Sequence, residues 1–348
     1  MTKRVTSHDV AKRAGVSRGV VSAVINGTPG IRVSEEKRRE VIKAIQELNY
    51  SVDAQARSMR TGRSGCIAAY GNLDNPFFLQ VLQGAQRACT ERGYHLLLYG
   101  YNRQESKQAL IQLYNQRRID GLLTKDVTGF ADEEWLASVR AAGLPYMSVE
   151  GYPEQEEVPS VLLDYGASMD LALDYLYGQT GLPPVYVELY SGSAYAPNWG
   201  DRNRRSAYEA WMERKGLVPA IWQQPDHDTD PQAWDEWLGG LPLPSALLTN
   251  WSRGGFLIYQ AARRLGLSIG KDLYVMAADN TMRANAYMVP PLSSVEIPYV
   301  EMGEAAAYRL LDMIEGNHPQ AASKIWIPAV LEPRESTLLA GEGGPQES

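Results

Sequence analysis

The spacing of apolar residues changes near residue 65, and this change divides the chain into two parts. Before it, apolar positions recur at helical spacing in short runs bounded by capping residues, which predicts three helices within the first fifty residues. After it, short apolar runs such as CIAAY, DGLLT and SVLLD alternate with longer helical segments such as 77–93 and 106–119. Alternation of strands and helices predicts parallel, right-handed βαβ units.

Each of the three predicted helices begins at a residue that can cap it. Thr6 opens a capping-box pattern, Ser17 precedes a helix over about Arg18–Ile25, and Ser34 precedes the third helix. Gly15 suits the left-handed residue that ends the first helix. Two short helices, a glycine turn and a third helix form the unit whose second helix enters the major groove of DNA. A small helical cap without a DNA function is the alternative.

The distribution of charge supports contact with DNA. The whole chain carries a net charge of −7, but residues 1–64 hold 13 basic and 6 acidic residues and carry +7, so the other 284 residues carry −14. A basic head on an acidic body indicates that the head meets a polyanion and the body does not. A solvated basic face is the alternative, and charge alone does not separate the two.

Composition excludes several classes of protein. The 348 residues, 44% hydrophobic and 22% charged, fit two or three ordinary globular domains. Cys66 and Cys89 form no CxxC motif, which excludes a disulfide framework and the usual zinc signatures and suggests a reducing compartment. The first residues contain no apolar signal-peptide region, and no run of 18 apolar residues occurs. We therefore expect a cytoplasmic protein without membrane contact, metal or cofactor.

Three segments of the head carry a resemblance to a known family. DVAKRAGVSRGVVSAVIN, VSEEKRREVIKAIQELNY and AQARSM resemble the DNA-binding head of the lactose/galactose repressor (LacI/GalR) family, and the resemblance continues along nearly the whole chain. It implies a three-helix helix-turn-helix head and a periplasmic-binding-protein-like α/β core of two Rossmann-like subdomains. The implied divisions are 1–50 for the head, 51–64 for a hinge-helix linker, 65–163 with 297–326 for the first core subdomain, 164–296 with 327–340 for the second, and 341–348 for a disordered tail.

The resemblance assigns DNA contacts within the head. Arg18 and Gly19 match the pair that opens the recognition helix, and Arg18 can present a bidentate fork to a guanine. Gly19 has no side chain and Ala23 stands where the family often has arginine, so base reading would depend on Arg18 and Arg4. The remaining expected contacts are short polar side chains, several of which would touch phosphates: Thr6, Ser17, Ser22 and Asn26.

The linker 51–64 is polar and basic. In the family this segment is a short helix that becomes ordered on operator DNA, where an apolar side chain from each subunit wedges into the minor groove. Met59 occupies that position, where leucine is usual, and Ala56 and Arg57 are further expected DNA contacts. Without the resemblance, a flexible tether would be the preferred interpretation.

Side chains just beyond the carboxyl ends of the predicted strands are candidates for ligand binding, because open α/β sheets bind ligands there. The resemblance places Glu150 at the position of a cleft acid, Arg204 at that of the arginine that grips the effector, and Asp279 at that of a carboxylate that reaches sugar hydroxyls. Trp251 stands where the family has an aspartate. The full set of expected effector contacts is Asp74, Asn75, Phe77, Glu150, Tyr165, Trp199, Arg204, Asn250, Trp251 and Asp279.

The tryptophans narrow the class of ligand. Six of the eight lie between residues 199 and 251, and Trp199 and Trp251 stand on predicted loops beside Arg204 and Asn250. An aromatic plate that faces carboxylates and an arginine suits a sugar, because the C–H faces stack and the hydroxyls take charge-assisted hydrogen bonds. We therefore expect a saccharide. Nucleosides, polyols and anionic metabolites are the alternatives, and packing under the cleft lip is the alternative role for Trp251.

The function expected from the sequence is that of a transcriptional regulator, a repressor of carbohydrate-utilisation genes. It would bind palindromic double-stranded operator DNA as a homodimer, since the tail GEGGPQES has no heptads for a tetramerising coiled coil. A small-molecule effector in the cleft between the subdomains would change its DNA affinity. Release and co-repression both remain open as the direction of that change.

Two other classes of protein are the alternatives. A sugar-binding receptor without DNA function is disfavoured by the basic head. A glycosidase that uses the cleft acids Glu150 and Asp279 is the other alternative. Catalysis in general is weakly supported, because the chain has no GxSxG, Walker A or HExxH motif and its four histidines are scattered. The acidic segment QPDHDTDPQ is expected to be a solvated loop rather than a metal or acid–base site. We therefore expect no catalytic residues and no enzyme activity.

Overall fold

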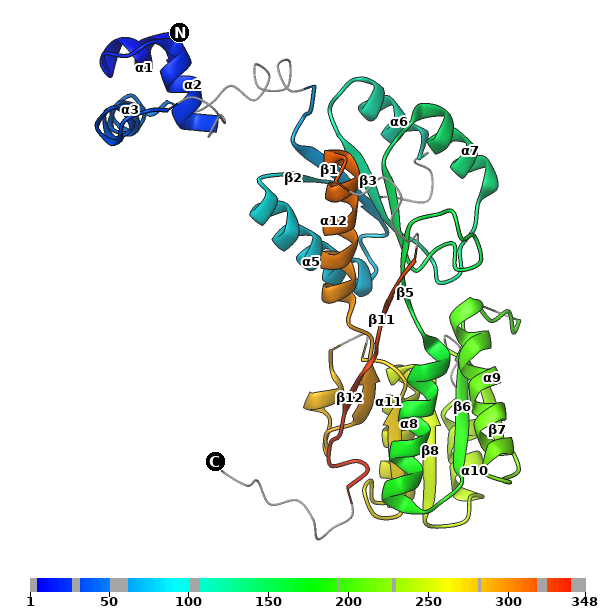
Figure 1. The fold of residues 1–348 in the computed structure, drawn as a ribbon. Coiled ribbons are helices and arrows are strands. Elements are labelled where there is room, and N and C mark those ends of the chain that lie inside the picture. Colours follow the sequence, from blue (N-terminus) through cyan, green and yellow to red (C-terminus); the bar gives the residue numbers. More distant parts are fainter. Residues whose placement is uncertain are drawn as a thin grey trace. The chain divides into compact units, whose positions relative to one another are not determined.

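The computed structural model describes residues 5–26, 32–50, 62–100, 107–192, 194–226, 230–280, 283–317 and 324–338. The chain forms two compact units, residues 1–64 and 65–348 (Figure 1). The expected hinge-helix residues 51–61 and the tail 341–348 lie outside the described residues.

The first unit contains three helices, α1 (Ser7–Arg13), α2 (Arg18–Asn26) and α3 (Glu35–Glu47). The backbone N–H of Thr6 donates to the Asp9 carboxylate at 2.8 Å, which is the reciprocal half of a capping box. Gly15 has a φ of +63°, and Ser17 Oγ accepts from the third N–H after it at 3.3 Å. The three helices enclose a small apolar core of Val10, Ala11, Val21, Val41 and Ala44.

The second unit contains two six-stranded sheets, and the first of them is parallel throughout. Its strand order is β11-β5-β4-β3-β1-β2. The strands are β1 (Cys66–Gly71), β2 (His95–Gly100), β3 (Gly121–Lys125), β4 (Tyr146–Val149), β5 (Ser160–Leu163) and β11 (Lys324–Ile327).

Helices cover both faces of this first sheet (Figure 1). One face packs against α5 (Pro76–Arg92) and α12 (Tyr299–Glu315), and the other packs against α6 (Gln108–Asn115) and α7 (Glu133–Ala142). Helices α5 and α12 approach closely: a Cβ at Gly84 would lie 1.8 Å from the Val300 carbonyl oxygen, and one at Gly303 would lie 2.1 Å from that of Val81. Only glycine fits at these two positions.

The second sheet has the order β12-β10-β9-β8-β6-β7, and only β12 runs antiparallel to its neighbour. Its strands are β6 (Pro184–Tyr190), β7 (Ile221–Pro225), β8 (Ser245–Thr249), β9 (Leu273–Ala277), β10 (Ser293–Glu296) and β12 (Val330–Glu332). Helices α8 (Tyr165–Thr180) and α9 (Trp199–Arg214) cover one face, and α10 (Pro231–Gly239) and α11 (Ser252–Leu265) cover the other. A short 3₁₀ turn, η1 (Asn285–Tyr287), precedes β10.

The chain passes between the two sheets after β5, after β10 and after β11 (Figure 1). Because nearly all strands are parallel, the carboxyl ends of each sheet gather at one edge. This is the architecture of a helix-turn-helix head followed by a two-subdomain α/β core, as the sequence predicted. None of the helices among the described residues combines the length and hydrophobicity that crossing a bilayer requires.

Candidate functional site

A cavity of about 350 Å³ lies at the carboxyl ends of strands from both sheets. We refer to it as the main cavity. Phe77, Thr128 and Tyr299 contribute to its wall from the first subdomain, and most of the remaining wall comes from the second. The lining residues are Phe77, Thr128, Tyr165, Ser191, Asn198, Arg204, Asp226, Trp251, Ser252, Arg253, Asp279, Ile297 and Tyr299.

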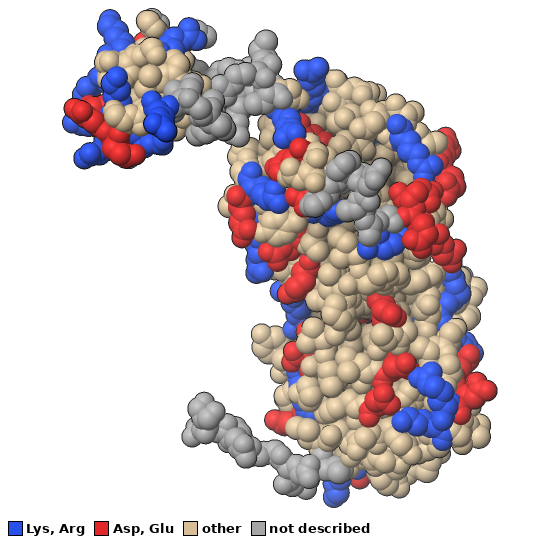
Figure 2. All heavy atoms as spheres, in the orientation of Figure 1, with Lys and Arg blue, Asp and Glu red and all other residues tan. Residues whose placement is uncertain are grey.

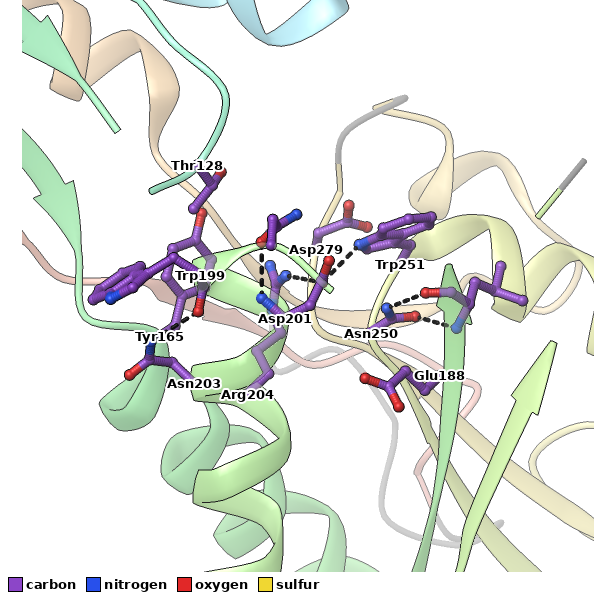
Figure 3. Close-up of polar contacts among 12 residues, drawn as sticks. Thr128, Tyr165, Glu188, Trp199, Asp201, Asn203, Arg204, Asn250, Trp251 and Asp279 are labelled. Carbon is purple, nitrogen blue, oxygen red and sulfur yellow. Dashed lines mark hydrogen bonds and ion pairs between the residues drawn. The ribbon is translucent and has the colours of Figure 1, made fainter. Parts of the chain in front are cut away.

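Arg204 supplies a buried positive charge to the main cavity. Helix α9 begins after Asn198, whose side chain accepts the N–H of Asp201 at 2.9 Å, and Arg204 follows one turn later. Its Nη1 lies 3.3 Å from Asp201 Oδ1, and its guanidinium lies 4.5 Å from the ring centre of Tyr165 (Figure 3). Burial opposes the charge, yet Tyr165, Asp201 and Asp279 raise the pKa of Arg204 above its usual value. Its buried Nε has no hydrogen-bond partner among the described residues.

Asp279 supplies a carboxylate to the same cavity. It follows β9, is 4% exposed, and its Oδ1 accepts the backbone N–H of Ser252 at 2.6 Å. Because Ser252 is the first residue of α11, the amino end of that helix orients the carboxylate. Arg253 and Asp226 add a second pair of opposite charges to the wall, and Arg253 Nε donates to the Asp226 carbonyl at 2.8 Å. The charged groups that line the cavity are therefore balanced.

Aromatic side chains line the cavity between these charges. The indole N–H of Trp251 donates to Asp201 Oδ1 at 3.2 Å, which fixes the orientation of the indole (Figure 3). Burial raises the pKa of the Asp201 carboxyl, although Arg204 opposes the shift. The rings of Phe77 and Tyr299 lie 4.6 Å apart and belong to the first subdomain. The main cavity thus combines apolar ring faces with positively and negatively charged groups that can form hydrogen bonds.

Glu150 does not line the main cavity but holds three side chains that do. Its carboxylate is 1% exposed and accepts hydrogen bonds from the hydroxyls of Thr128 at 3.1 Å, Tyr299 at 3.0 Å and Tyr165. Lys125 Nζ lies 2.7 Å away. Burial would raise the pKa of Glu150, but Lys125 and the hydroxyls outweigh it and hold that pKa below its usual value. Glu150 has a φ of +69°, the left-handed region that glycine favours.

The structure brings five of the ten expected effector contacts to the cavity wall: Phe77, Tyr165, Arg204, Trp251 and Asp279. Four others are engaged elsewhere. Asn75 caps α5 and Asp74 is exposed beside it. Asn250 forms two hydrogen bonds with the backbone of Leu189, at 2.9 and 2.8 Å, and Trp199 packs edge-on against the Tyr165 ring at 5.9 Å (Figure 3).

Several lining residues were not expected from the sequence. Asp226 was assigned to a solvated loop, but it follows the carboxyl end of β7 and lines the cavity. Tyr299 lies at the second return between the sheets, where sequence pattern gives no sign of a site. Ser252 and Arg253 directly follow Trp251, so the strand-end rule could have found them. Among the described residues, no group of three or more His, Cys, Asp and Glu side chains could hold a metal ion.

The head presents its candidate DNA contacts at the amino end of α2. Ser17, Arg18 and Gly19 are exposed there, Ser22 is half-buried, and Thr6 is exposed at the start of α1. Figure 2 shows many Lys and Arg side chains on the visible surface of this unit. Asn26 is placed only as part of α2. Four other expected contacts lie outside the described residues: Arg4, Ala56, Arg57 and Met59.

Comparison with known proteins gives matches along most of the chain. Residues 6–53 match the family described as bacterial regulatory proteins of the lacI family, and residues 189–337 match the periplasmic binding protein-like domain. The HTH-type transcriptional repressor PurR of Erwinia tasmaniensis is 28% identical over 345 residues, which covers 94% of this chain and 96% of that protein. PurR of Proteus mirabilis is 29% identical over 347 residues with the same coverage.

Solved structures share the fold. A lac repressor dimer bound to operator and the anti-inducer ONPF has a TM-score of 0.73 and 21% identity, with 97% of this chain and 100% of that chain covered. A complex of the transcriptional regulator CelR with cellobiose has a TM-score of 0.62 and 23% identity, with 96% and 100% covered. At these identities the likeness establishes the architecture of head and core.

Proposed function

Because this chain belongs to the lactose/galactose repressor family of DNA-binding regulatory proteins, we propose that it represses carbohydrate-utilisation genes and that a small saccharide in the main cavity changes its affinity for DNA. It binds a palindromic operator as a homodimer through its head, in the cytoplasm. The relatives above are transcriptional repressors rather than enzymes.

One observation carries the choice of a saccharide. The main cavity places the buried guanidinium of Arg204 and the buried carboxylate of Asp279 among the rings of Phe77 and Trp251. Sugar hydroxyls both donate and accept, so they can pair with carboxylate and guanidinium groups in one site. The C–H faces of the sugar ring contact the aromatic side chains. A volume of about 350 Å³ lies at the lower end of the range for small-molecule pockets.

The second subdomain supplies Arg204 and Asp279 to the main cavity. The first subdomain supplies Phe77, Thr128 and Tyr299. A ligand that contacts both walls binds better when they are close together, and it therefore stabilises one arrangement of the subdomains. If operator DNA binds better to another arrangement, the effector lowers the affinity for the operator. The operator then lowers the affinity for the effector by the same coupling free energy. Tyr165 and Tyr299 lie where the chain passes between the sheets, after β5 and after β10. A ligand that contacts these side chains therefore depends on how the two subdomains are arranged.

A thermal-shift screen of the full chain against monosaccharides, disaccharides, nucleosides, purine bases and sugar phosphates tests this proposal. A ligand present at 100 times its Kd adds about 2.7 kcal/mol to the stability of the folded state. We expect neutral saccharides to raise Tm and Asp279→Asn to abolish the increase. Glu154→Gln, at an exposed carboxylate outside both sets of lining residues, serves as the control and should keep it. If only nucleosides or purine bases raise Tm, the saccharide proposal is wrong while DNA-binding regulation stands.

A further inference from the structure

A second cavity, of about 250 Å³, adjoins the main cavity and shares three lining residues with it: Ser191, Asn198 and Trp251. We refer to it as the side cavity. These three residues therefore lie where the two cavities meet. The side cavity extends from this boundary between the end of β6 and the segment 195–198 that precedes α9.

The side cavity has the chemistry of a site for a neutral, hydroxyl-bearing group. It is lined by the buried carboxylates of Glu188 and Asp201. Glu188 is paired with Arg205 at 3.3 Å and accepts from Gln223 at 2.8 Å, and Asp201 is paired with Arg204 at 3.3 Å, so both carboxylates already have a cationic partner. Among the described residues, no lysine or arginine lines the side cavity itself. A phosphate or carboxylate would therefore find no cation on the wall of the side cavity to pair with, whereas hydroxyls can donate to the carboxylate oxygens.

Trp251 makes the boundary suitable for a ligand that occupies both spaces. Its indole lines both cavities and is held by the hydrogen bond to Asp201 at 3.2 Å. The ring of Tyr195 faces the same side cavity, and its hydroxyl donates to Glu188 at 2.8 Å. Each cavity thus offers both aromatic surface and a buried carboxylate, the two elements that a sugar ring uses.

We propose that the effector contains at least two sugar units. The first lies in the main cavity against Arg204 and Asp279, and the second, which is neutral, lies in the side cavity against Glu188 and Asp201. This proposal rests on the saccharide effector proposed above. The main cavity alone, at about 350 Å³, is near the minimum for a small-molecule pocket, and the added 250 Å³ brings the site well inside the usual range.

Isothermal titration calorimetry of the full chain with maltose, cellobiose, lactose, trehalose and melibiose, and with glucose and galactose, tests the proposal. We expect one disaccharide to bind at least about tenfold more tightly than either of its component sugars. Ala196→Phe fills the side cavity from an exposed position, and it should weaken the disaccharide at least about tenfold more than the monosaccharide. Ala141→Phe, on the exposed surface of α7 and outside both cavities, is the matched control.

The outcomes separate this proposal from the one on which it rests. A monosaccharide that binds as tightly as its disaccharide, or an Ala196→Phe variant that weakens both equally, overturns the two-unit effector and leaves the saccharide effector intact. Binding of nucleosides with no binding of any sugar overturns both. Should Ala196→Phe fail to fold, Tyr195→Phe removes one hydroxyl from the side cavity, and the same selective loss of disaccharide binding is expected.

Discussion

Replacing Glu150 by glutamine is expected to destabilise the core and to loosen the main cavity together. The carboxylate is 1% exposed, and it lies 2.7 Å from Lys125 Nζ, whose side chain is 4% exposed. The variant keeps the shape of the side chain but leaves the lysine charge buried without its partner. Removing one member of a buried ion pair costs about 3–5 kcal/mol, a large part of the roughly 5–15 kcal/mol of a typical protein.

The same substitution disturbs the hydroxyls that Glu150 holds. The carboxylate accepts from Thr128, Tyr165 and Tyr299, whereas an amide has one oxygen and places an N–H₂ group against the remaining hydroxyls. Since all three residues line the main cavity, effector affinity should fall as well as stability. Urea denaturation followed by circular dichroism measures the first effect, and calorimetric titration with the saccharide measures the second.

Two further variants make this test decisive. Glu154→Gln changes an exposed carboxylate a few residues away, and it should alter the free energy of unfolding by less than about 0.5 kcal/mol. Lys125→Met combined with Glu150→Gln removes both charges and should recover part of the lost stability, because the uncompensated charge is gone. A loss below about 1 kcal/mol in Glu150→Gln, or no recovery in the double variant, would refute the assigned ion pair.

Four other predictions concern the pH dependence of the Glu150 contribution, the effector site and the DNA-binding head. The folded-state pKa of Glu150 is depressed, so its ionised carboxylate contributes to stability above its ordinary pKa of 4.5, and this contribution is lost as pH falls through the folded pKa. Urea titrations at falling pH should therefore show the free energies of unfolding of wild type and Glu150→Gln converging. Arg204→Lys keeps the charge but loses the forked donors, and it should weaken the effector at least about tenfold by calorimetry while operator affinity without effector stays at the wild-type value. Arg18→Ala should relax base choice at one position of each half-site by about 1–3 kcal/mol, measured by binding selection from randomised DNA; an unchanged preference at every position would exclude base reading by Arg18. Gly19→Ala should stabilise the head by up to about 1 kcal/mol in thermal melts, because a Cβ there meets only Ser17 Oγ at 3.6 Å; a lower Tm would show that the position is sterically restricted.

Local chemistry explains what the sequence could predict. The cap at Ser17 and the left-handed Gly15 depend on neighbouring residues only, so the head was predicted closely. The strand-end rule pointed to Asp279 and the family resemblance pointed to Arg204, and both residues line the main cavity. The rule gives the position of a residue and not the direction of its side chain, which is why Asn250 was expected in the cavity although its amide binds the backbone of Leu189.

The parts that escaped prediction depend on contacts between distant segments. Tyr299 reaches the cavity because α12 returns to the first sheet after β10, and it meets a carboxylate 149 positions earlier in the chain. Trp199 resembled a stacking plate, but its ring packs edge-on against Tyr165, and a Cβ at Gly129 would lie 2.1 Å from the Trp199 Cβ. Periodicity and spacing contain no information on such pairings.

The most direct test of the central claim measures operator affinity with and without the saccharide. An operator is first selected from randomised DNA, and the full chain is then titrated by fluorescence anisotropy at fixed salt, since DNA affinity depends steeply on salt concentration. We predict that the saccharide found by calorimetry changes the operator Kd by about 5- to 150-fold, the usual range of coupling between sites, and that Arg204→Lys reduces this change at the same saccharide concentration. A saccharide that saturates the main cavity and leaves the operator Kd unchanged would contradict the account.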